Sequence, residues 1–201
     1  MKNAIIGKKI GMTRIFDKEG NSVPVTLVYV EPVVVTQVKK IEKNGFYAVQ
    51  VGYQNKKNLN KPEKGHLQES KANSKYLAEF NDLQKELNVG DKINIDCIKV
   101  DDLVSVTGIS KGKGFSGVIK RHGFSRGPES HGSDHHRAPG SIGGGYPQRV
   151  IKGKRMAGRM GNQNITIKNL KVLDVNLQDN TLLLKGSVPG PKNSILKIKV
   201  Y

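Results

Sequence analysis

The sequence predicts a mainly β protein of the α+β class, built as a closed β-barrel or a sandwich, with a small helical insert and a long irregular basic extension. Three observations predict this fold. Most apolar residues alternate with polar ones in short segments, which is the pattern of half-buried strands. One segment repeats at a helical period instead. A glycine-rich, basic stretch over residues 108–162 keeps neither period for long.

The expected strands are short, alternating and separated by turn residues. They lie at residues 4–6, 25–30, 33–38, 47–53, 93–97, 104–106, 165–167, 173–177, 182–184 and 196–200. Gly7 is expected to end the first strand, residues 17–21 form a turn, and Asn44-Gly45 predicts a hairpin. Many short strands at a spacing of about 8–12 residues are typical of a barrel or a sandwich.

The insert differs from the strands around it. Residues 55–72 are polar and rich in lysine, so we expect a loop there. Tyr76, Phe80, Leu83 and Leu87 then follow the spacing of one helix face, which predicts a helix over residues 74–87 that ends at Asn88-Val89-Gly90.

These elements predict five segments. The barrel takes residues 1–54, 92–110 and 163–201, the insert takes 55–91, and the extension takes 111–162.

Composition points to an anionic partner. The 201-residue chain has a formal net charge of +17 and a pI near 9.9, which is typical of a protein that binds nucleic acid. No apolar run approaches the ~20 residues that a membrane span needs, and the apolar stretch within residues 1–9 is shorter than we expect of a signal peptide. We therefore expect no membrane partner. The single cysteine, Cys97, provides no disulfide framework, which suits a reducing, cytoplasmic environment.

The extension concentrates this charge. Residues 108–162 hold 14 of the 23 glycines, four of the five histidines and eleven lysines or arginines, against the two acids Glu129 and Asp134. Such a segment cannot bury enough apolar surface to offset the entropy of ordering it. We therefore expect a polyanionic partner, and folded RNA fits best because its grooves admit a glycine-rich backbone.

Two enzyme interpretations find little support in the sequence. Residues 112–117 match G-x-G-x-x-G, but no long apolar helix follows as a dinucleotide fold requires, and no P-loop occurs. We therefore expect no cofactor, no small-molecule substrate and no enzyme. The alternative is an RNA-acting enzyme that uses the histidine cluster with Ser130, Ser133 or Ser141, although no nucleophile elbow is visible.

The histidines also suggest a metal, because His131 and His135 have plausible ligand spacing. No cysteine lies near them, and Arg126 and Arg137 would repel a cation. We therefore expect no metal, and interpret the imidazoles as groups that stack on or hydrogen-bond to RNA.

The candidate RNA-binding residues are the cations and histidines of the extension and of the N-terminal Gly/Lys segment, which we expect to be a turn. They are Lys8, Lys9, Arg14, Lys111, Lys113, Lys120, Arg121, His122, Arg126, His131, His135, His136, Arg137, Arg149, Lys152, Lys154, Arg155 and Arg159. Phe115, Phe124 and Tyr146 are candidates for base stacking. The chain must reverse near the middle of the extension, so the expected tip is Gly140, Ser141, Gly143, Gly144, Gly145 and Tyr146.

Five motifs resemble the bacterial-type large-subunit ribosomal proteins of the L3 family. They are GKKIGMT (7–13), TGISKGKGFSGVIKRHGF (107–124), HRAPGSIG (136–143), KGKRMAGRMGN (152–162) and LLLKGSVPGPKNS (182–194), and the resemblance covers essentially the whole chain.

The resemblance implies a translation-factor-like β-barrel with an α/β insert. It also implies a primary binder of large-subunit rRNA near its 3′ end that nucleates subunit assembly. The extension would run toward the peptidyl-transferase centre, with the family members numbered fourteen and nineteen as neighbours. Some relatives carry a methylated glutamine after Ser-Ile-Gly, where this chain has Tyr146 nearest in position.

Overall fold

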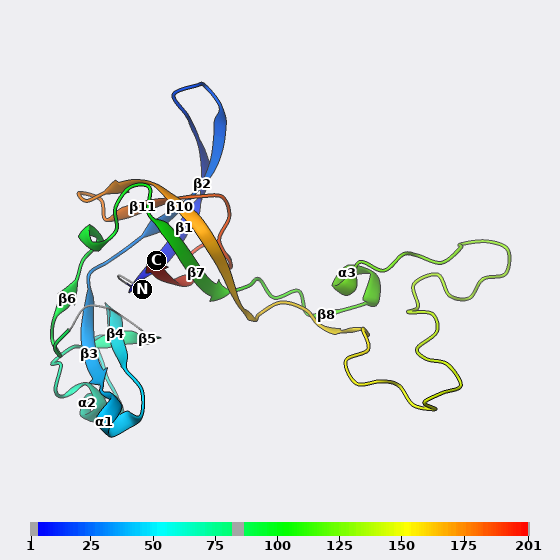
Figure 1. Ribbon diagram of the computed structural model, residues 1–201, viewed down its shortest axis with the longest axis horizontal. Helices are drawn as coiled ribbons and strands as arrows, with labels where there is room; N and C mark the ends of the chain where they lie inside the picture. Colours follow the sequence, from blue (N-terminus) through cyan, green and yellow to red (C-terminus); the bar gives the residue numbers. More distant parts are fainter. Residues whose placement is uncertain (1–3, 82–86, 201) are drawn as a thin grey trace. The chain divides into compact units, whose positions relative to one another are not determined.

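The computed structural model describes residues 4–81 and 87–200 (Figure 1). The fold is mainly β, as the alternation predicts. Contacts divide the chain into two compact units, one formed by Met1–Ser110 with Asn164–Tyr201 and the other by Lys111–Gln163. Among the described residues, no helix is long and apolar enough to cross a membrane.

Six strands of the first unit form a closed barrel in the order β1-β12-β7-β10-β11-β2. They are β1 (Ala4–Phe16), β2 (Ser22–Tyr29), β7 (Leu103–Ile109), β10 (Asn164–Asn176), β11 (Thr181–Lys185) and β12 (Ile195–Val200). Every pairing around the barrel is antiparallel. Ile5, Val28, Val106, Leu182 and Ile198 are fully buried, so the alternating apolar residues supply its core.

The first strand is much longer than the sequence predicts. We expected Gly7 to end it and residues 7–14 to form a turn, but β1 continues to Phe16. It continues because β2 offers a partner to residues 8–16, with a register shift between Lys9 and Gly11. The predicted turn at 17–21 then closes the hairpin, where the Asp17 amide donates to Asn21 O at 2.9 Å. β1 and β2 thus form an arm at the top of Figure 1.

A four-stranded antiparallel sheet lies in the same unit, in the order β5-β4-β3-β6. Its strands are β3 (Val33–Lys39), β4 (Ala48–Asn55), β5 (Ser74–Asn81) and β6 (Lys92–Ile93). We assigned residues 33–54 and 92–93 to the barrel, and that assignment is wrong. Alternation identifies a strand but not its partner, since pairing depends on contacts far apart in sequence.

The helix predicted over residues 74–87 is wrong where the structure describes it, because β5 occupies Ser74–Asn81, while residues 82–86 lie outside the described part of the chain. Tyr76 and Phe80 have helical spacing, but Ser74, Ala78 and Phe80 are buried at the period of a strand. Residues 74–81 form a strand and not a helix because they pair with the open edge of β4 from Ser74 to Asn81.

Three short helices also differ from the prediction. They are α1 (Ile41–Asn44), α2 (Lys61–Leu67) and the 3-10 turn η1 (Ile95–Cys97). The Asn44-Gly45 pair ends α1 with Gly45 at a φ of 75°, so a helical turn replaces the tight hairpin between β3 and β4. η1 replaces part of the strand predicted at 93–97, and the Cys97 side chain is half-buried.

The helix α2 lies where we expected only a loop. Its signal was present in the sequence, because Asn60 precedes Pro62 and Glu63, a pattern typical of a helix start. The Glu63 carboxylate accepts a hydrogen bond from the Asn60 amide at 2.9 Å. Lys56, which also donates to this carboxylate, lowers the pKa of Glu63, and the Asn60 amide adds to the effect.

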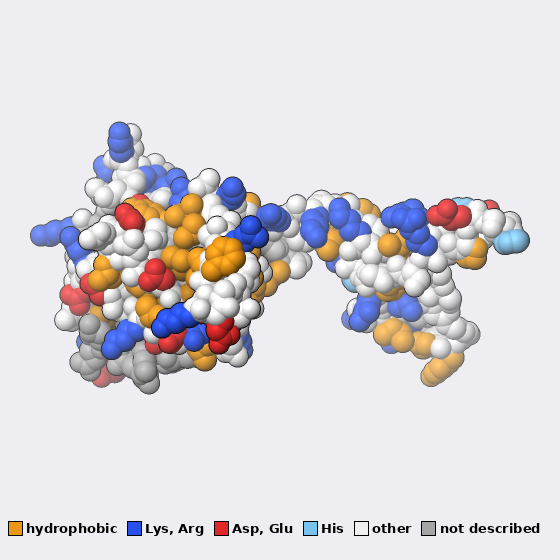
Figure 2. Space-filling view, turned by 90° about the horizontal axis from the view of Figure 1, so that it is seen from above, with side chains coloured by type: hydrophobic (Ala, Val, Ile, Leu, Met, Phe, Trp, Pro, Cys, Tyr) orange, Lys and Arg blue, Asp and Glu red, His pale blue; other side chains and the backbone are white. Residues whose placement is uncertain are grey.

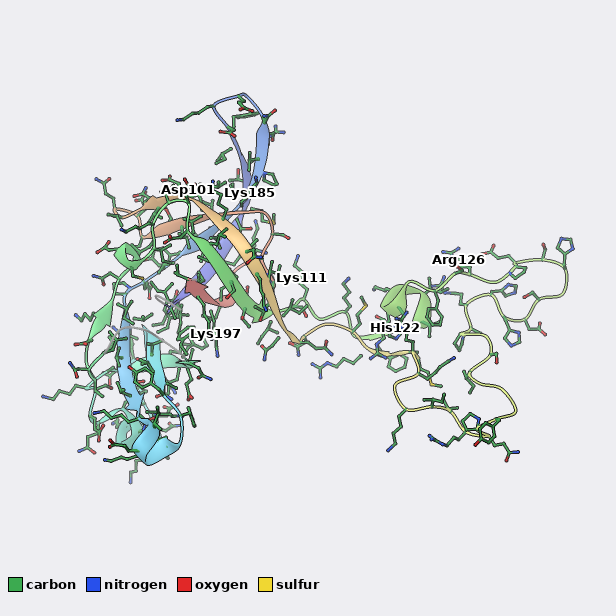
Figure 3. The ribbon with its side chains drawn as sticks, in the orientation of Figure 1. Asp101, Lys111, His122, Arg126, Lys185 and Lys197 are labelled. Carbon is green, nitrogen blue, oxygen red and sulfur yellow. The ribbon has the colours of Figure 1, made fainter. Side chains whose placement is uncertain are left out.

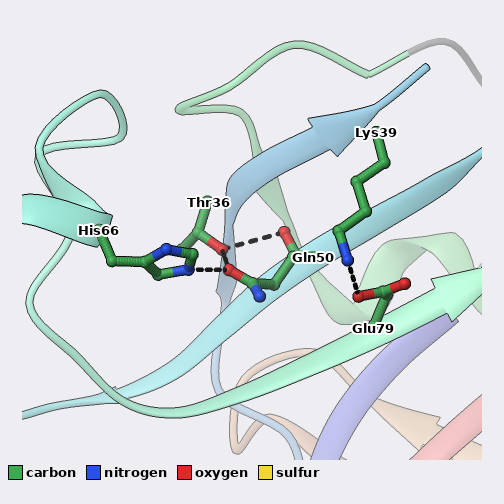
Figure 4. A network of polar contacts seen from close by, with 5 residues as sticks. All are labelled: Thr36, Lys39, Gln50, His66 and Glu79. Atoms are coloured by element: carbon green, nitrogen blue, oxygen red, sulfur yellow. Dashed lines mark hydrogen bonds and ion pairs between the residues drawn. The ribbon is translucent and has the colours of Figure 1, made fainter. Parts of the chain in front are cut away.

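Polar contacts hold α2 on the sheet (Figure 4). The Gln50 Oε1 atom on β4 lies 2.8 Å from His66 Nε2 on α2 and accepts a hydrogen bond from Thr36 Oγ1 on β3 at 2.9 Å. Lys39 on β3 and Glu79 on β5 form an ion pair across the same sheet. Three strands and one helix are therefore joined through side chains.

Tyr53 is the largest fully buried side chain of the core, with 1% of its surface exposed. Its hydroxyl oxygen has no hydrogen-bond partner among the described residues. Burial, followed by the negative charge of Glu31, raises the pKa of Tyr53 to about 12.

Candidate nucleic-acid interface

The extension is not irregular throughout, because a short stem joins its outgoing and returning limbs. The stem strands are β8 (Phe115–Ser116) and β9 (Gly158–Arg159), with Phe115 opposite Arg159. The Lys113 amide donates to Met160 O, and the Met160 amide donates to Gly114 O, both at 2.9 Å. We predicted no regular structure here, since two-residue strands are too short to show a period.

A one-turn helix, α3 (Val118–His122), follows β8 and contacts the returning limb. Arg121 Nη1 donates to Met156 O at 2.8 Å, and His122 Nε2 lies 3.0 Å from the same oxygen. The His122 and Phe124 rings lie 6.0 Å apart between centroids. Arg121, His122 and Phe124 therefore contact other parts of the extension, and two of these residues help to hold its limbs together.

The base of the stem depends on one glycine. Gly161 has a φ of +74°, and a Cβ atom there would lie 2.1 Å from Lys111 O. Any other residue would collide with the backbone of the outgoing limb as well as adopt a left-handed conformation. Gly161 therefore sets how closely the two limbs approach.

The distal part of the extension, residues 125–155, is held by a few polar contacts. The Gly127 amide donates to His136 O at 3.1 Å, and His136 Nδ1 lies 2.7 Å from Pro128 O. Arg126 Nη1 and Glu129 Oε1 form an exposed ion pair at 3.5 Å. Figure 3 shows Lys111, His122 and Arg126 following one another along the outgoing limb.

The predicted tip is open to solvent. Tyr146 has 92% of its surface exposed. A Cβ atom at Gly144 or Gly145 would meet nothing within 4 Å, and the Ser141 hydroxyl donates to Gly143 O at 2.9 Å. Among the described residues, therefore, no contact requires a glycine at 144 or 145.

The free cations of the extension line its surface, where Figure 2 shows many basic and few acidic side chains. Nine of the predicted cations are exposed and, among the described residues, have no carboxylate within ion-pair distance. They are Lys111, Lys113, Lys120, Arg137, Arg149, Lys152, Lys154, Arg155 and Arg159. These charges remain available to an external polyanion, as do the exposed rings of Phe115 and Tyr146.

The three candidates in the N-terminal segment lie on β1, in the other unit. Lys9 is 7% exposed, and its ammonium donates to Val188 O at 3.0 Å and Gly190 O at 3.2 Å, so Lys9 stabilises the barrel. Lys8 is half-buried. Arg14 is exposed, and its guanidinium lies 6.0 Å from the centre of the Phe16 ring. Phe16 was not among the predicted residues, although the alternation along residues 10–16 places its ring on the exposed side of β1.

The remaining histidines, His131 and His135, are exposed. Within residues 4–81 and 87–200, no three His, Cys, Asp or Glu side chains converge as metal ligands would. The Ser133 hydroxyl accepts from the His135 backbone amide at 3.4 Å, and the Ser141 hydroxyl bonds a backbone carbonyl. Both hydroxyls therefore bond the backbone in the structure.

The chain is similar to known proteins over nearly its whole length. The family model described as "Ribosomal protein L3" matches residues 2–181. Two relatives from Streptococcus pyogenes, serotype M6 (strain ATCC BAA-946 / MGAS10394) and serotype M1, are each described as "Large ribosomal subunit protein uL3". Each is 49% identical over 204 residues, which cover 99% of this chain and 97% of the relative.

The fold, the basic extension and these matches define a ribosomal protein, which is a structural component and not an enzyme. More particularly, the chain belongs to the ribosomal protein L3 family. The resemblance drawn from the five sequence motifs is confirmed.

Proposed function

We propose that the protein is a constituent of the large subunit of the cytoplasmic ribosome and binds large-subunit rRNA mainly through its extension. The observation that carries this proposal is the set of nine exposed cations without carboxylate partners among the described residues of the extension. Lysine and arginine side chains that neutralise phosphates release condensed counterions, which drives binding. Exposed Phe115 and Tyr146 add surfaces on which bases can stack.

The barrel has a different role in this proposal. Six paired strands with a filled core make a stiff body, and we propose that this translation-factor-like barrel orients the extension on the rRNA. The stem formed by β8, β9 and α3 then directs both limbs into the RNA. Residues 125–155, which have few internal contacts, would complete their folding on the RNA.

The family motifs and the solvent-exposed tip support a more detailed proposal for the position of the protein within the large subunit. We propose that the protein binds near the 3′ end of the large-subunit rRNA, nucleates subunit assembly, and lies beside the family members numbered fourteen and nineteen. Its tip, from Gly140 to Tyr146, would approach the peptidyl-transferase centre. The tip carries no carboxylate, imidazole or amine side chain that could take part in peptide-bond formation, so its role there would be to position RNA.

Charge removal on the extension tests the proposal. A triple variant, Lys152→Gln with Lys154→Gln and Arg155→Gln, should bind large-subunit rRNA at least tenfold more weakly than the wild type. The control is Lys43→Gln with Lys64→Gln and Lys99→Gln, which removes the same charge from exposed positions of the other unit. Equal affinity of the extension triple and the control triple would contradict an interface on the extension. In cells, the extension triple should also deplete large subunits in a sucrose gradient.

A further inference from the structure

A second basic site lies on the four-stranded sheet, far in sequence from the extension. A hollow of about 720 Å³ is bordered by the start of β3, the end of β4, the loop that precedes β5, and β6. Among the described residues, four lysines line it, namely Lys56, Lys57, Lys71 and Lys92, and one carboxylate, that of Glu31. The hollow therefore has a local excess of positive charge.

Three of these lysines are free to bind an external anion. Lys56 is occupied, because its ammonium donates to both carboxylate oxygens of Glu63 at 2.7 and 2.8 Å. Lys57, Lys71 and Lys92 are exposed and have no carboxylate within ion-pair distance in the part of the chain that the structure describes.

Hydrogen bonds of the backbone and of the Ser70 hydroxyl hold the loop that borders the hollow. The Lys56 amide donates to Asn73 O at 2.7 Å, which ties this loop to the end of β4. The Ser70 hydroxyl donates to Leu67 O at 3.0 Å and accepts from the Ala72 amide at 3.4 Å. Since this loop is already ordered, a ligand would lose less free energy in ordering the site.

The lining chemistry distinguishes between possible ligands. Besides the lysines, the described residues that line the hollow include the amides Gln54, Asn55 and Asn73 and the serines Ser70 and Ser74, and none of these described lining residues is aromatic. Centres of protein–protein interfaces are enriched in aromatic residues and depleted of lysine. Phosphate contacts, in contrast, come from lysine, serine, asparagine and glutamine.

We infer that this hollow binds backbone phosphates of RNA through Lys57, Lys71 and Lys92, as an rRNA contact separate from the extension. The inference rests on the proposed function, because rRNA is the polyanion to which both sites would bind. It assigns the four-stranded sheet a binding role of its own, in addition to its contribution to the core.

The test compares three triple variants of the full chain. The hollow triple is Lys57→Gln with Lys71→Gln and Lys92→Gln, and the control is the triple at Lys43, Lys64 and Lys99, which are exposed residues of the same unit that do not line the hollow. Losing three phosphate contacts should reduce the log–log salt slope of rRNA binding by about 2. Affinity should fall at least tenfold relative to the control, and thermal unfolding should show that all variants are folded.

The extension triple, measured alongside, separates this inference from the proposed function. If only the extension triple weakens binding, the hollow is not an rRNA site. If only the hollow triple weakens binding, the inference holds and the role proposed for the extension is wrong. If neither does, both are wrong.

A second measurement identifies the ligand class. The amide NMR signals of Gly52 and Gly90, which line the hollow, should shift on adding rRNA fragments. These shifts should be absent in the hollow triple. Polyglutamate is the probe for an acidic protein segment. If polyglutamate shifts these signals at lower concentration than RNA does, the ligand is a protein and the inference is overturned.

Discussion

Arg121 Nη1 lies 2.8 Å from Met156 O, and this hydrogen bond connects α3 to the returning limb of the extension. The sequence predicted Arg121 as a phosphate contact, whereas in the structure its guanidinium bonds the chain itself. Arg121→Ala should loosen the stem, because a hydrogen bond of this kind contributes about 1 kcal/mol.

The expected result is a roughly fivefold faster tryptic cleavage after Arg155 and Arg159 in RNA-free protein, since 1.4 kcal/mol corresponds to about tenfold in an opening equilibrium. Thermal unfolding of the barrel should not change. Arg137→Ala is the control, because Arg137 is exposed and has no carboxylate partner among the described residues. Unchanged cleavage in Arg121→Ala would show that the bond does not hold the stem.

Gly161→Ala should disrupt the base of the stem. The new Cβ atom would lie 2.1 Å from Lys111 O, so the backbone of one limb must move. Gly153→Ala is a matched control, because Gly153 has a similar φ of +83° but a Cβ atom added there would meet nothing within 4 Å. Tryptic cleavage after Lys113 should rise severalfold more in Gly161→Ala than in Gly153→Ala. Equal cleavage rates in the two variants would mean that the positive φ of the glycine, and not its close approach to Lys111 O, determines the stability of the stem.

Binding to large-subunit rRNA should depend steeply on salt. If about eight phosphates are neutralised, the log–log slope should be about −7, and affinity should fall about 10⁴-fold between 50 and 200 mM salt. Filter binding or fluorescence titration across this range gives the slope. A slope shallower than about −2 would contradict an electrostatic origin of binding.

Stability at high pH should carry a contribution from Tyr53. The pKa of Tyr53 is raised to about 12 in the folded protein from about 10 in the unfolded chain. As pH rises, the Tyr53 hydroxyl therefore loses its proton in the unfolded chain before it does so in the folded protein. The free energy of unfolding should therefore fall between pH 10 and 12, by about 2 kcal/mol from this group, and should not depend on it below pH 10.

Tyr53→Phe separates this contribution from that of other groups. The variant should lack the Tyr53 part of the decline between pH 10 and 12. At pH 7 its stability should equal or exceed that of the wild type, because the hydroxyl oxygen has no hydrogen-bond partner among the described residues. Chemical denaturation of both proteins at pH 7, 10 and 11.5 provides the comparison. If the free energy of unfolding falls equally in both proteins between pH 10 and 11.5, a group other than Tyr53 causes the decline.

Gly144→Asp tests the proposed tip. A Cβ atom added at Gly144 would meet nothing within 4 Å, so thermal unfolding of the free protein should not change. Within the ribosome, the added bulk and negative charge would lie beside RNA phosphates. Purified mutant ribosomes should therefore show altered peptide-bond formation in a puromycin-type reaction, or altered binding of drugs at the peptidyl-transferase centre. Wild-type behaviour in both, at full stoichiometry of the mutant protein, would exclude a functional tip at this position.

The sequence predicted the kinds of elements better than their partners. Alternation identified β2, β3 and β12 because each has a buried face of its own. It could not show that β3 and β4 leave the barrel for a second sheet, or that β5 completes that sheet at the edge of β4. Those outcomes depend on long-range pairing, which a local pattern does not record.

In the candidate site, too, local sequence patterns did not predict contacts between residues far apart in the chain. Charge and glycine content identified the extension, since they are properties of the sequence itself. The role of Lys9 was not predictable, because its carbonyl partners, Val188 and Gly190, lie 179 and 181 positions away in the chain. The hollow beside Lys57, Lys71 and Lys92 was missed for a similar reason, because the fold brings these lysines together from three separate segments.

The barrel order has a consequence for how the protein is made. β12 pairs with both β1 and β7, yet it follows the other barrel strands and the whole extension in the chain. During translation, β1 therefore leaves the exit tunnel and waits with one edge unpaired, and β7 waits with both edges unpaired, while a polycation of some fifty residues emerges between β7 and β10. At this stage, the unpaired strand edges of the nascent chain can pair with strands of other chains, and its basic extension can bind nucleic acid non-specifically. Stalling translation before Ile195 should accordingly yield chains that aggregate or require a chaperone, whereas chains released after Val200 should not.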